Sequence, residues 1–151
     1  MSNTISKQEV EAAQQAWGEG IIAIGKATDF KQAAINHIDK FYGYDIGTVL
    51  FKPTLASVKQ FRGDKKSALS YFIGQDLPED KGFALAPFTK VVWENEGIII
   101  NGGTAFAMGN YFFTKASGEV IKVEYSFGYI KDDNGDLKIN LHHSSIPYAA
   151  G

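Results

Sequence analysis

A pair of histidines followed by a pair of serines near the C-terminus has the residue types and spacing that best suit chemistry. They lie in residues 137–146, which alternate as a β-strand does, so every second side chain points the same way. On that alternation His143 and Ser145 follow the aliphatic side chains of the segment. His142 and Ser144 fall on the opposite, polar face. We therefore expect His143 and Ser145 to enter a hydrophobic cavity; the alternative is a buried histidine that only satisfies a backbone carbonyl.

The number of available ligands argues against a metal site. Catalytic zinc is usually held by three histidines, by two histidines and a glutamate, or by two cysteines and a histidine. The chain has three histidines and no cysteine. Without a bulge, only one of His142 and His143 can enter the cavity. A zinc site would then need His37 and a carboxylate, and no Asp or Glu stands out on the apolar faces. We expect no metal and no other cofactor.

Covalent catalysis by serine is also a poor fit. His143 and Ser145 are two residues apart on one strand face, roughly 6–7 Å by strand rise, which is too far for direct activation. The chain has no Gly-x-Ser-x-Gly motif, paired carboxylates, phosphate loop or dinucleotide fingerprint. The two side chains are better placed to hold the two ends of one small ligand.

The length, composition and net charge of the chain limit the classes of protein to which it can belong. The 151 residues fit one domain, which we place at residues 5–148, and the 20 aromatic residues (Phe 11, Tyr 7, Trp 2) suit a sheet-lined cavity. A net charge of -2 without a basic cluster argues against binding to nucleic acid or to an anionic membrane. The sequence contains no apolar signal core and no run of membrane-spanning length. We expect a cytoplasmic protein, unless a leader has been removed.

Capping patterns predict three helices before the sheet. Ser6 and Glu9 form a capping box, and an apolar stripe follows at helical spacing. Asp29 is expected to cap a second helix. Residues 64–74 predict a short third helix that ends at a glycine.

The pattern then changes to strands, after a short apolar segment at residues 48–52. The Asn134–Gly135 pair is typical of a hairpin turn. Helices followed by antiparallel strands indicate an α+β fold, with the N-terminal helices packed on one face of a strongly curved sheet. The expected parts are a long or bent strand at 83–93, a turn at 94–97, a hairpin of 98–100 with 104–114, a strand at 119–130 and the final strand.

Other polar residues are candidates for the same cavity. Thr54 follows Pro53 at the end of the short apolar segment, where it can bind a ligand or only end a turn. Tyr71 borders the apolar face of the third helix. Asn110 lies on a strand with two mostly apolar faces and is either a polar wall residue or a structural amide.

Four segments carry a resemblance to a known family: 49–54 (VLFKPT), 68–72 (ALSYF), 107–112 (AMGNYF) and, most specifically, 141–148 (LHHSSIPY). Together they resemble the iota-class carbonic anhydrases. That family is related to the association domain of calcium/calmodulin-dependent kinase II and to the nuclear transport factor 2-like superfamily. The resemblance spans nearly the whole chain. It implies a cone-shaped α+β domain, a homodimer through the open sheet, and interconversion of carbon dioxide, water and bicarbonate.

The resemblance also implies a set of site residues. Thr54, Tyr71, His143 and Ser145 match the substrate-pocket positions of the family, and our ligand count favours its metal-free members. In this hypothesis the three hydroxyls polarise the substrate oxygens, and the histidine orients the attacking water or accepts its proton. Cavity walls are expected from Phe72, Phe106, Tyr125 and Phe127, with Asn110 among the pocket residues.

Two other functions fit the same fold. One is a non-catalytic domain for small-ligand binding or oligomerisation, because this superfamily fold often serves only binding and assembly. The other is a proton-transfer enzyme similar to ketosteroid isomerase, which needs a carboxylate base in the cavity. The sequence offers no strong candidate for that base.

Overall fold

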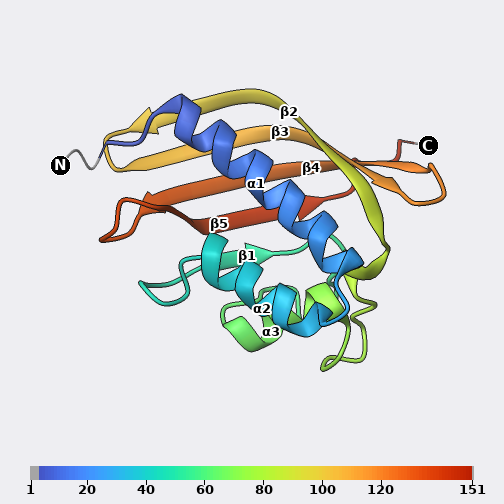
Figure 1. Cartoon of the computed structure of the whole chain (residues 1–151). Coiled ribbons are helices and arrows are strands. Elements are labelled where there is room, and N and C mark those ends of the chain that lie inside the picture. The colour runs from blue at the N-terminus through green and yellow to red at the C-terminus, as the bar shows by residue number, and fades with distance from the viewer. Residues whose placement is uncertain (1–3, 151) are drawn as a thin grey trace.

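The computed structural model describes residues 4–150 of the chain. Two long helices come first, and a broad sheet follows them along the chain (Figure 1). None of the helices in this range is long and apolar enough to cross a membrane. In chain order the elements are α1 (Lys7–Lys26), α2 (Phe30–Phe41), β1 (Leu50–Lys52), α3 (Lys65–Ile73), the 3-10 helix η1 (Phe83–Leu85), β2 (Phe88–Asn101), β3 (Thr104–Lys115), β4 (Val120–Lys131) and β5 (Leu137–Ser145).

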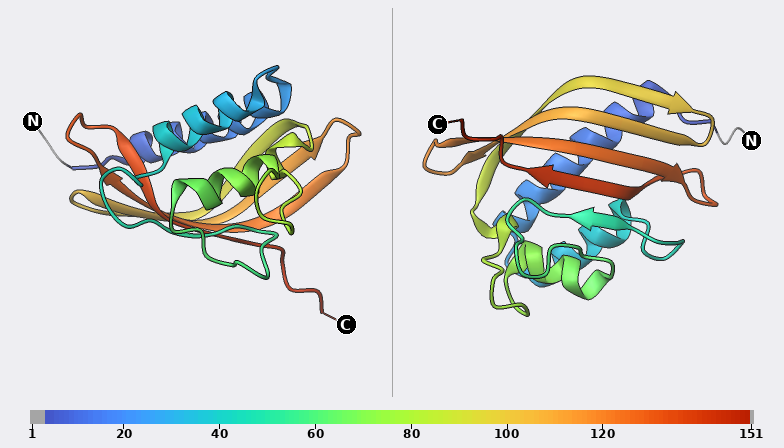
Figure 2. Two further views of the ribbon diagram at one scale, coloured as in Figure 1. Left: turned by 90° about the horizontal axis from the view of Figure 1, so that it is seen from below. Right: turned by 180° about the vertical axis from the view of Figure 1, so that it is seen from behind.

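The strands form one sheet in the order β1-β5-β4-β3-β2. β2 to β5 pair as antiparallel neighbours, whereas β1 runs parallel to β5 and places Phe51 beside His142. The sheet is curved, and the helices lie against its concave face (Figure 2). This arrangement confirms the predicted α+β class. It also leaves the opposite face of the sheet, here called the outer face, without a helix over it.

The helix ends form where the capping residues predict them. Ser6 and Glu9 make a complete capping box at the start of α1, and the side chain of Asp29 accepts a hydrogen bond from a first-turn amide of α2. Asp64 caps α3 in the same way, and α3 ends at Gly74 in the left-handed conformation. These ends are determined by residues within one turn, which explains why the sequence predicts them.

The region between α3 and β3 differs from expectation in two places. Residues 83–85 form η1 and not strand, and residues 94–97 do not turn, because β2 continues through them. The register between β2 and β3 shifts between Asn95 and Gly97, which is a β-bulge. Gly109 lies opposite this bulge, and a Cβ there would be 2.2 Å from the Glu94 carbonyl oxygen. The bulge therefore bends a single long strand at the point where the sequence suggested a turn.

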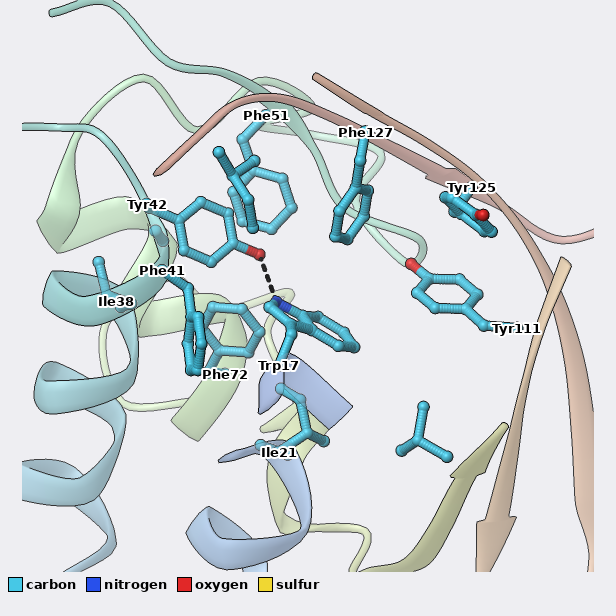
Figure 3. Packing of buried hydrophobic residues seen from close by; sticks show 14 of the residues in the cluster. Trp17, Ile21, Ile38, Phe41, Tyr42, Phe51, Phe72, Tyr111, Tyr125 and Phe127 are labelled. Carbon is cyan, nitrogen blue, oxygen red and sulfur yellow. Dashed lines mark hydrogen bonds between the residues drawn. The ribbon is translucent and has the colours of Figure 1, made fainter. Parts of the chain in front are cut away.

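Aromatic side chains fill the space between the helices and the concave face (Figure 3). Trp17 of α1 is at the centre of this cluster, with ring centroids of Tyr111, Phe127 and His142 all 5.7–5.8 Å from its own. Such offset and edge-on ring pairs add to the stabilisation that burial provides. The cluster fixes the rings that surround the polar groups described next.

Candidate active site

A β-bulge in β5 decides which of its polar residues face the helices. Tyr129 pairs with Ile139 and Gly128 pairs with Leu141, so Asn140 is an extra residue on β5. Gly128 leaves room for it, because a Cβ at that position would be 2.9 Å from both the Asn140 side-chain oxygen and the Leu141 Cβ. One extra residue reverses the alternation for the rest of the strand.

The consequence is a correction to the predicted orientation of the strand end. His142 and Ser144 point inward and are only 3% and 1% exposed, whereas His143 is exposed and Ser145 is half-buried on the outer face. The prediction that His143 and Ser145 enter the cavity is therefore wrong. It applied strict alternation through a position where the strand contains a bulge. The catalytic role predicted for His143 and Ser145 is a separate question, which substitution of Ser145 tests below.

The inward side chains of β5 face a small cavity beneath β1 and α3. The space open to the centre of a water-sized sphere is about 10 Å³, close to the minimum that holds one water molecule. Its walls are mainly aromatic, and its polar groups are hydroxyls and one imidazole. The lining residues are Trp17, Phe51, Pro53, Thr54, Tyr71, Phe72, Phe83, Tyr111, His142 and Ser144.

Four of these polar groups, together with the neighbouring Tyr42, form one continuous hydrogen-bonded series, which we call the polar chain. The hydroxyl of Thr54 lies 2.6 Å from that of Ser144, which in turn lies 2.5 Å from the hydroxyl of Tyr111. Nε2 of His142 is 3.1 Å from the Tyr111 hydroxyl, and its Nδ1 is 2.8 Å from the hydroxyl of Tyr42. The chain runs from a half-buried end at Thr54 to the aromatic core.

Tyr71 adds a further hydroxyl beside Thr54. Its oxygen accepts a hydrogen bond of 3.2 Å from the backbone N–H of Leu55, and burial raises the pKa of Tyr71 to about 12. Burial also raises the pKa of Tyr111, so both phenols are neutral at physiological pH. The cavity therefore presents uncharged hydroxyl groups that can donate hydrogen bonds.

The imidazole of His142 is also neutral. Complete burial lowers its pKa well below the ordinary value of 6.5, and the neighbouring His143 and His37 act in the same direction. Its ring lies between those of Phe51 and Phe127, with centroids 4.7 Å and 4.1 Å away. These contacts hold the ring plane, so the two nitrogens keep separate partners.

A buried ion pair holds the segment that carries Thr54 against α3. Arg62 donates two 2.8 Å hydrogen bonds to the carboxylate of Asp80, a third to the carbonyl of Ser67 and a fourth to that of Lys59. Neither charged side chain is exposed. The hydroxyl of Ser70 donates a 2.6 Å bond to the same carboxylate. The Arg62 end of the segment is thus joined to the helix that carries Tyr71.

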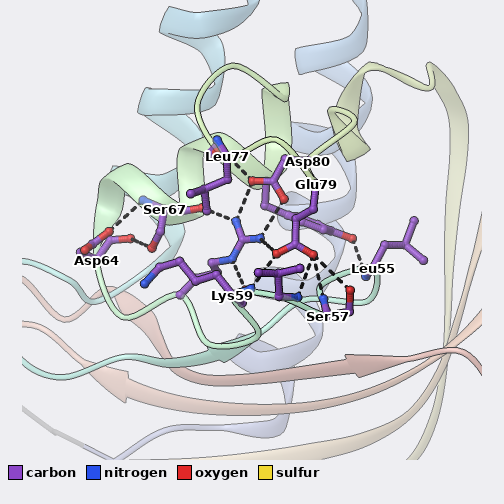
Figure 4. A network of polar contacts seen from close by, with 12 residues as sticks. Leu55, Ser57, Lys59, Asp64, Ser67, Leu77, Glu79 and Asp80 are labelled. Atoms are coloured by element: carbon purple, nitrogen blue, oxygen red, sulfur yellow. Dashed lines mark hydrogen bonds and ion pairs between the residues drawn. The ribbon is translucent and has the colours of Figure 1, made fainter.

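Glu79 fixes the middle of the same segment (Figure 4). Its carboxylate accepts hydrogen bonds from the backbone N–H groups of Ser57, Val58 and Lys59, at 2.8, 3.1 and 2.7 Å. These donors, with the bond from Ser57 first, lower the pKa of Glu79 to about 2. The segment is therefore held by ionised groups that do not reach the cavity themselves.

Three of the predicted site residues come together in the cavity. Thr54 and Tyr71 contribute the hydroxyls described above, and Phe72 forms part of the wall. Thr54 and Tyr71 lie close together because the Tyr71 hydroxyl bonds the backbone N–H of Leu55, the residue after Thr54. The positions of these residues agree with the sequence prediction, whereas their roles in catalysis remain to be proposed.

Other predicted residues lie elsewhere. Asn110 lines a depression of about 420 Å³ on the outer face, together with His143 and Ser145. Phe106 is 47% exposed, so its predicted place in the cavity wall is wrong. It shares a strand face with Asn110, which is the face of β3 turned away from the helices.

Tyr125 faces the helices but is not among the residues that line the cavity. Its hydroxyl donates to the side chain of Asn95 and accepts a 3.2 Å bond from the amide of Gln14. Tyr125 also lines the outer-face depression with Asn110, His143 and Ser145, and its predicted place in a substrate pocket stays a prediction. The hydroxyl belongs to a separate polar cluster between α1 and β2.

Sequence reasoning missed five groups that the structure brings to the site: Trp17, Tyr42, Tyr111, His142 and Ser144. Two of them follow from the bulge, for which a glycine inside the strand predicted at residues 119–130 was the available signal. Of the other three, Trp17 falls on the apolar stripe of the first helix, Tyr111 on a mostly apolar strand face and Tyr42 at the end of the second helix. No local pattern indicates that their polar atoms meet.

The site offers little to a metal ion. Within residues 4–150, no three side chains among the histidines, aspartates and glutamates are grouped closely enough to hold one. The cavity itself contributes one imidazole and several neutral hydroxyls, which is not a ligand set that zinc prefers.

The fold defines the class of protein first. The chain is similar to a putative calcium/calmodulin-dependent protein kinase II association domain from Xanthomonas campestris, with a TM-score of 0.70 and 23% identity over 96% of this chain and 91% of that one. This likeness concerns the fold alone. It confirms the nuclear transport factor 2-like, α+β architecture that the sequence predicts.

The family follows from closer similarities. Residues 8–146 match the family model for metal-independent carbonic anhydrase. A metal-independent carbonic anhydrase from Nostoc sp. is 46% identical over 98% of this chain and 77% of that protein. A crystal structure of a cyanobacterial iota-carbonic anhydrase complexed with bicarbonate is 44% identical, with a TM-score of 0.96 over 99% of this chain and 97% of that one. The chain belongs to the metal-independent carbonic anhydrase family.

Proposed function

We propose that this carbonic anhydrase interconverts carbon dioxide and bicarbonate in the cavity lined by Thr54, Tyr71, Tyr111 and Ser144, without a metal ion. The observation that carries the proposal is the convergence of these hydroxyls in a cavity with aromatic walls. The bicarbonate bound by the similar cyanobacterial enzyme supports the same substrate here.

The hydroxyls supply what the reaction needs. Hydration forms a bond between the water oxygen and the carbon of carbon dioxide, and an electron pair of one C=O bond moves to its oxygen. The negative charge that develops on that oxygen is stabilised by the hydroxyls of Thr54 and Tyr71, each by about 2–4 kcal/mol, while Ser144 and Tyr111 orient the Thr54 hydroxyl through their hydrogen bonds. The proton released by the water leaves through the half-buried end of the cavity at Thr54 to the solvent. No bond to a protein atom is made or broken.

The cavity walls strengthen these hydrogen bonds. Phe51, Phe72 and Phe83 line the cavity and are buried or half-buried, so bulk water is excluded from the reacting atoms. In such surroundings a hydrogen bond to a charged oxygen is stronger than in water. The same walls give a small, uncharged molecule such as carbon dioxide a favourable place to bind.

The outer face supports the homodimer that the sequence predicts. Phe106, Met108 and Ile99 are 47%, 59% and 66% exposed, and all three belong to β2 or β3. A second copy of the chain would cover these apolar side chains, which are costly to expose as a group. We include this dimer and a single domain at residues 5–148 in the proposal. The cytoplasmic location stays a prediction.

One experiment tests the activity and the absence of a metal requirement together. The protein is treated exhaustively with a chelator, its metal content is measured by elemental analysis, and carbon dioxide hydration is followed by stopped flow in the same sample. We expect full activity with substoichiometric metal. Thr54→Val serves as the matched variant for the cavity, because valine keeps the side-chain shape and removes one hydroxyl. We expect it to lower kcat about 10²-fold under the same conditions.

Two results would contradict the proposal in different ways. Activity that appears only after a divalent cation is added would reject the metal-free mechanism. No hydration activity with or without metal, in a folded protein, would reject the enzyme and favour a non-catalytic binding or assembly domain.

A further inference from the structure

The polar chain ends in a group that can only donate. The indole N–H of Trp17 points at the hydroxyl oxygen of Tyr42, 3.1 Å away (Figure 3). An indole has no acceptor nitrogen, so the direction of this hydrogen bond does not depend on any choice of tautomer. The hydrogen of the Tyr42 hydroxyl must therefore point elsewhere. Among the described residues its partner is Nδ1 of His142, at 2.8 Å.

The direction of the first bond determines that of the next ones. Since Nδ1 of His142 accepts from Tyr42, the neutral ring carries its hydrogen on Nε2. Nε2–H then donates to the hydroxyl oxygen of Tyr111 at 3.1 Å, and Tyr111 donates to Ser144 at 2.5 Å. Ser144 in turn donates to Thr54 at 2.6 Å. Every hydrogen in the chain points from the core towards the cavity.

The reverse direction leaves groups unpaired. A hydrogen on Nδ1 of His142 would point at the Tyr42 oxygen, which already accepts the indole N–H. The Tyr42 hydroxyl hydrogen would then have no acceptor in the described part of the chain, although the side chain is only 2% exposed. Burying a donor without a partner is unfavourable. The imidazole cannot rotate to exchange the partners of its two nitrogens, because the rings of Phe51 and Phe127 pack against it.

We infer that Trp17 sets the direction of the whole polar chain and holds His142 as the neutral Nε2–H tautomer, which makes His142 a positioning residue and not a base. The lone pair that a base would need on Nε2 is absent in this tautomer. The chain instead delivers hydroxyl hydrogens to the cavity, where the oxygens of bicarbonate carry negative charge. The catalytic meaning of this inference rests on the proposed function, whereas the tautomer does not.

The wild-type protein provides the first test. Long-range proton–nitrogen correlation spectra of the ¹⁵N-labelled protein distinguish the two neutral tautomers and the charged ring. His143→Gln removes the exposed histidine from the spectrum, and Tyr42→Phe identifies His142 by changing its Nδ1 signal. We expect His142 to be neutral with its hydrogen on Nε2 from about pH 5 to pH 8. A hydrogen on Nδ1, or a ring that charges within this range, would overturn the inference.

A matched pair of substitutions provides the second test. Trp17→Phe removes the donor, and Trp93→Phe removes the same atoms from an adjacent ring, with centroids 5.7 Å apart. The indole nitrogen of Trp93 has no hydrogen-bond partner within residues 4–150. We expect Trp17→Phe to populate the second His142 tautomer and to lower kcat at least about tenfold. Trp93→Phe should leave the tautomer unchanged.

The outcomes separate this inference from the proposed function. If both variants change the tautomer equally, Trp17 does not set the direction and the inference is wrong. If Trp17→Phe fails to fold, the wild-type spectrum decides. An Nε2–H tautomer in a protein without hydration activity would reject the proposed function but not the direction of the chain. An active enzyme in which His142 is the Nδ1–H tautomer would reject the inferred direction of the polar chain but not the proposed function.

Discussion

Replacing Ser144 by alanine tests the site most directly, because its neighbour Ser145 provides a control on the other face of the same strand. The Ser144 oxygen lies between the hydroxyls of Tyr111 and Thr54, at 2.5 and 2.6 Å, and the side chain is 1% exposed. Alanine removes both bonds, leaves the Tyr111 hydrogen without its acceptor and changes the cavity volume little. The Ser145 hydroxyl makes one 3.3 Å bond to Glu124 near the surface.

The structure gives the expected size of each effect. Loss of a buried acceptor should lower the free energy of unfolding of Ser144→Ala by about 1–3 kcal/mol. Ser144 donates to Thr54 and so orients the hydroxyl that meets the substrate, and its loss should lower kcat by about tenfold or more. Ser145→Ala should change the free energy of unfolding by less than about 0.5 kcal/mol, since its bond is exposed. We expect its kcat to stay within about twofold of wild type, because no preorganised donor of the cavity is lost.

Stopped-flow hydration of carbon dioxide with a pH indicator measures kcat, and urea unfolding of the same samples measures stability. The reasoning is refuted if Ser145→Ala loses activity while Ser144→Ala retains it. That result would restore the orientation expected from strict alternation and would place the catalytic groups on the outer face. An equal loss of kcat in Ser144→Ala and Ser145→Ala would show that activity depends on β5 as a whole and not on which face of the strand a side chain occupies.

Two further predictions concern buried charge. Burial lowers the pKa of His37 to about 3, with Lys40 adding to the shift, so below pH 6.5 the unfolded chain binds a proton that the folded chain does not. The free energy of unfolding should therefore be highest above pH 6.5 and should fall by about 3 kcal/mol on going to about pH 4.5. Urea unfolding should show a smaller fall for His37→Phe, and an equal fall would contradict this. Asp80→Ala should lower the free energy of unfolding by about 3–5 kcal/mol, because among the described carboxylates it leaves the buried Arg62 with only its 3.6 Å contact to Glu79. The exposed Asp76→Ala should lower it by less than about 1 kcal/mol. Similar values for the two variants would show that burial adds nothing to the contribution of the Arg62–Asp80 pair.

The sequence predicts best those features that neighbouring residues determine. Ser6, Asp29 and Asp64 cap their helices because each reaches an amide within one turn. Thr54 and Tyr71 are predicted as site residues from short motifs, and the structure places both at the cavity. Their hydrogen-bond partners, in contrast, come from distant parts of the chain. Ser144 is 90 residues from Thr54, so no local pattern links the two.

The orientation of β5 could not be predicted from β5 alone. Its residues alternate without any sign of an extra position, and the bulge at Asn140 depends on the neighbouring strand. Gly128 accommodates the bulge because it has no side chain to collide with Asn140 and Leu141. The pairing of two strands therefore decides which histidine enters the cavity.

The bulge and the polar chain explain each other. Inward rotation of His142 and Ser144 buries two polar side chains, which is unfavourable unless every donor and acceptor has a partner. The structure supplies those partners from Tyr42 on one side and Tyr111 on the other. A buried series of this kind tolerates only one arrangement of hydrogens when one end is a fixed donor, and Trp17 is that donor. The side chain that sequence patterns assign to the apolar core is therefore the one that orients the polar groups of the site.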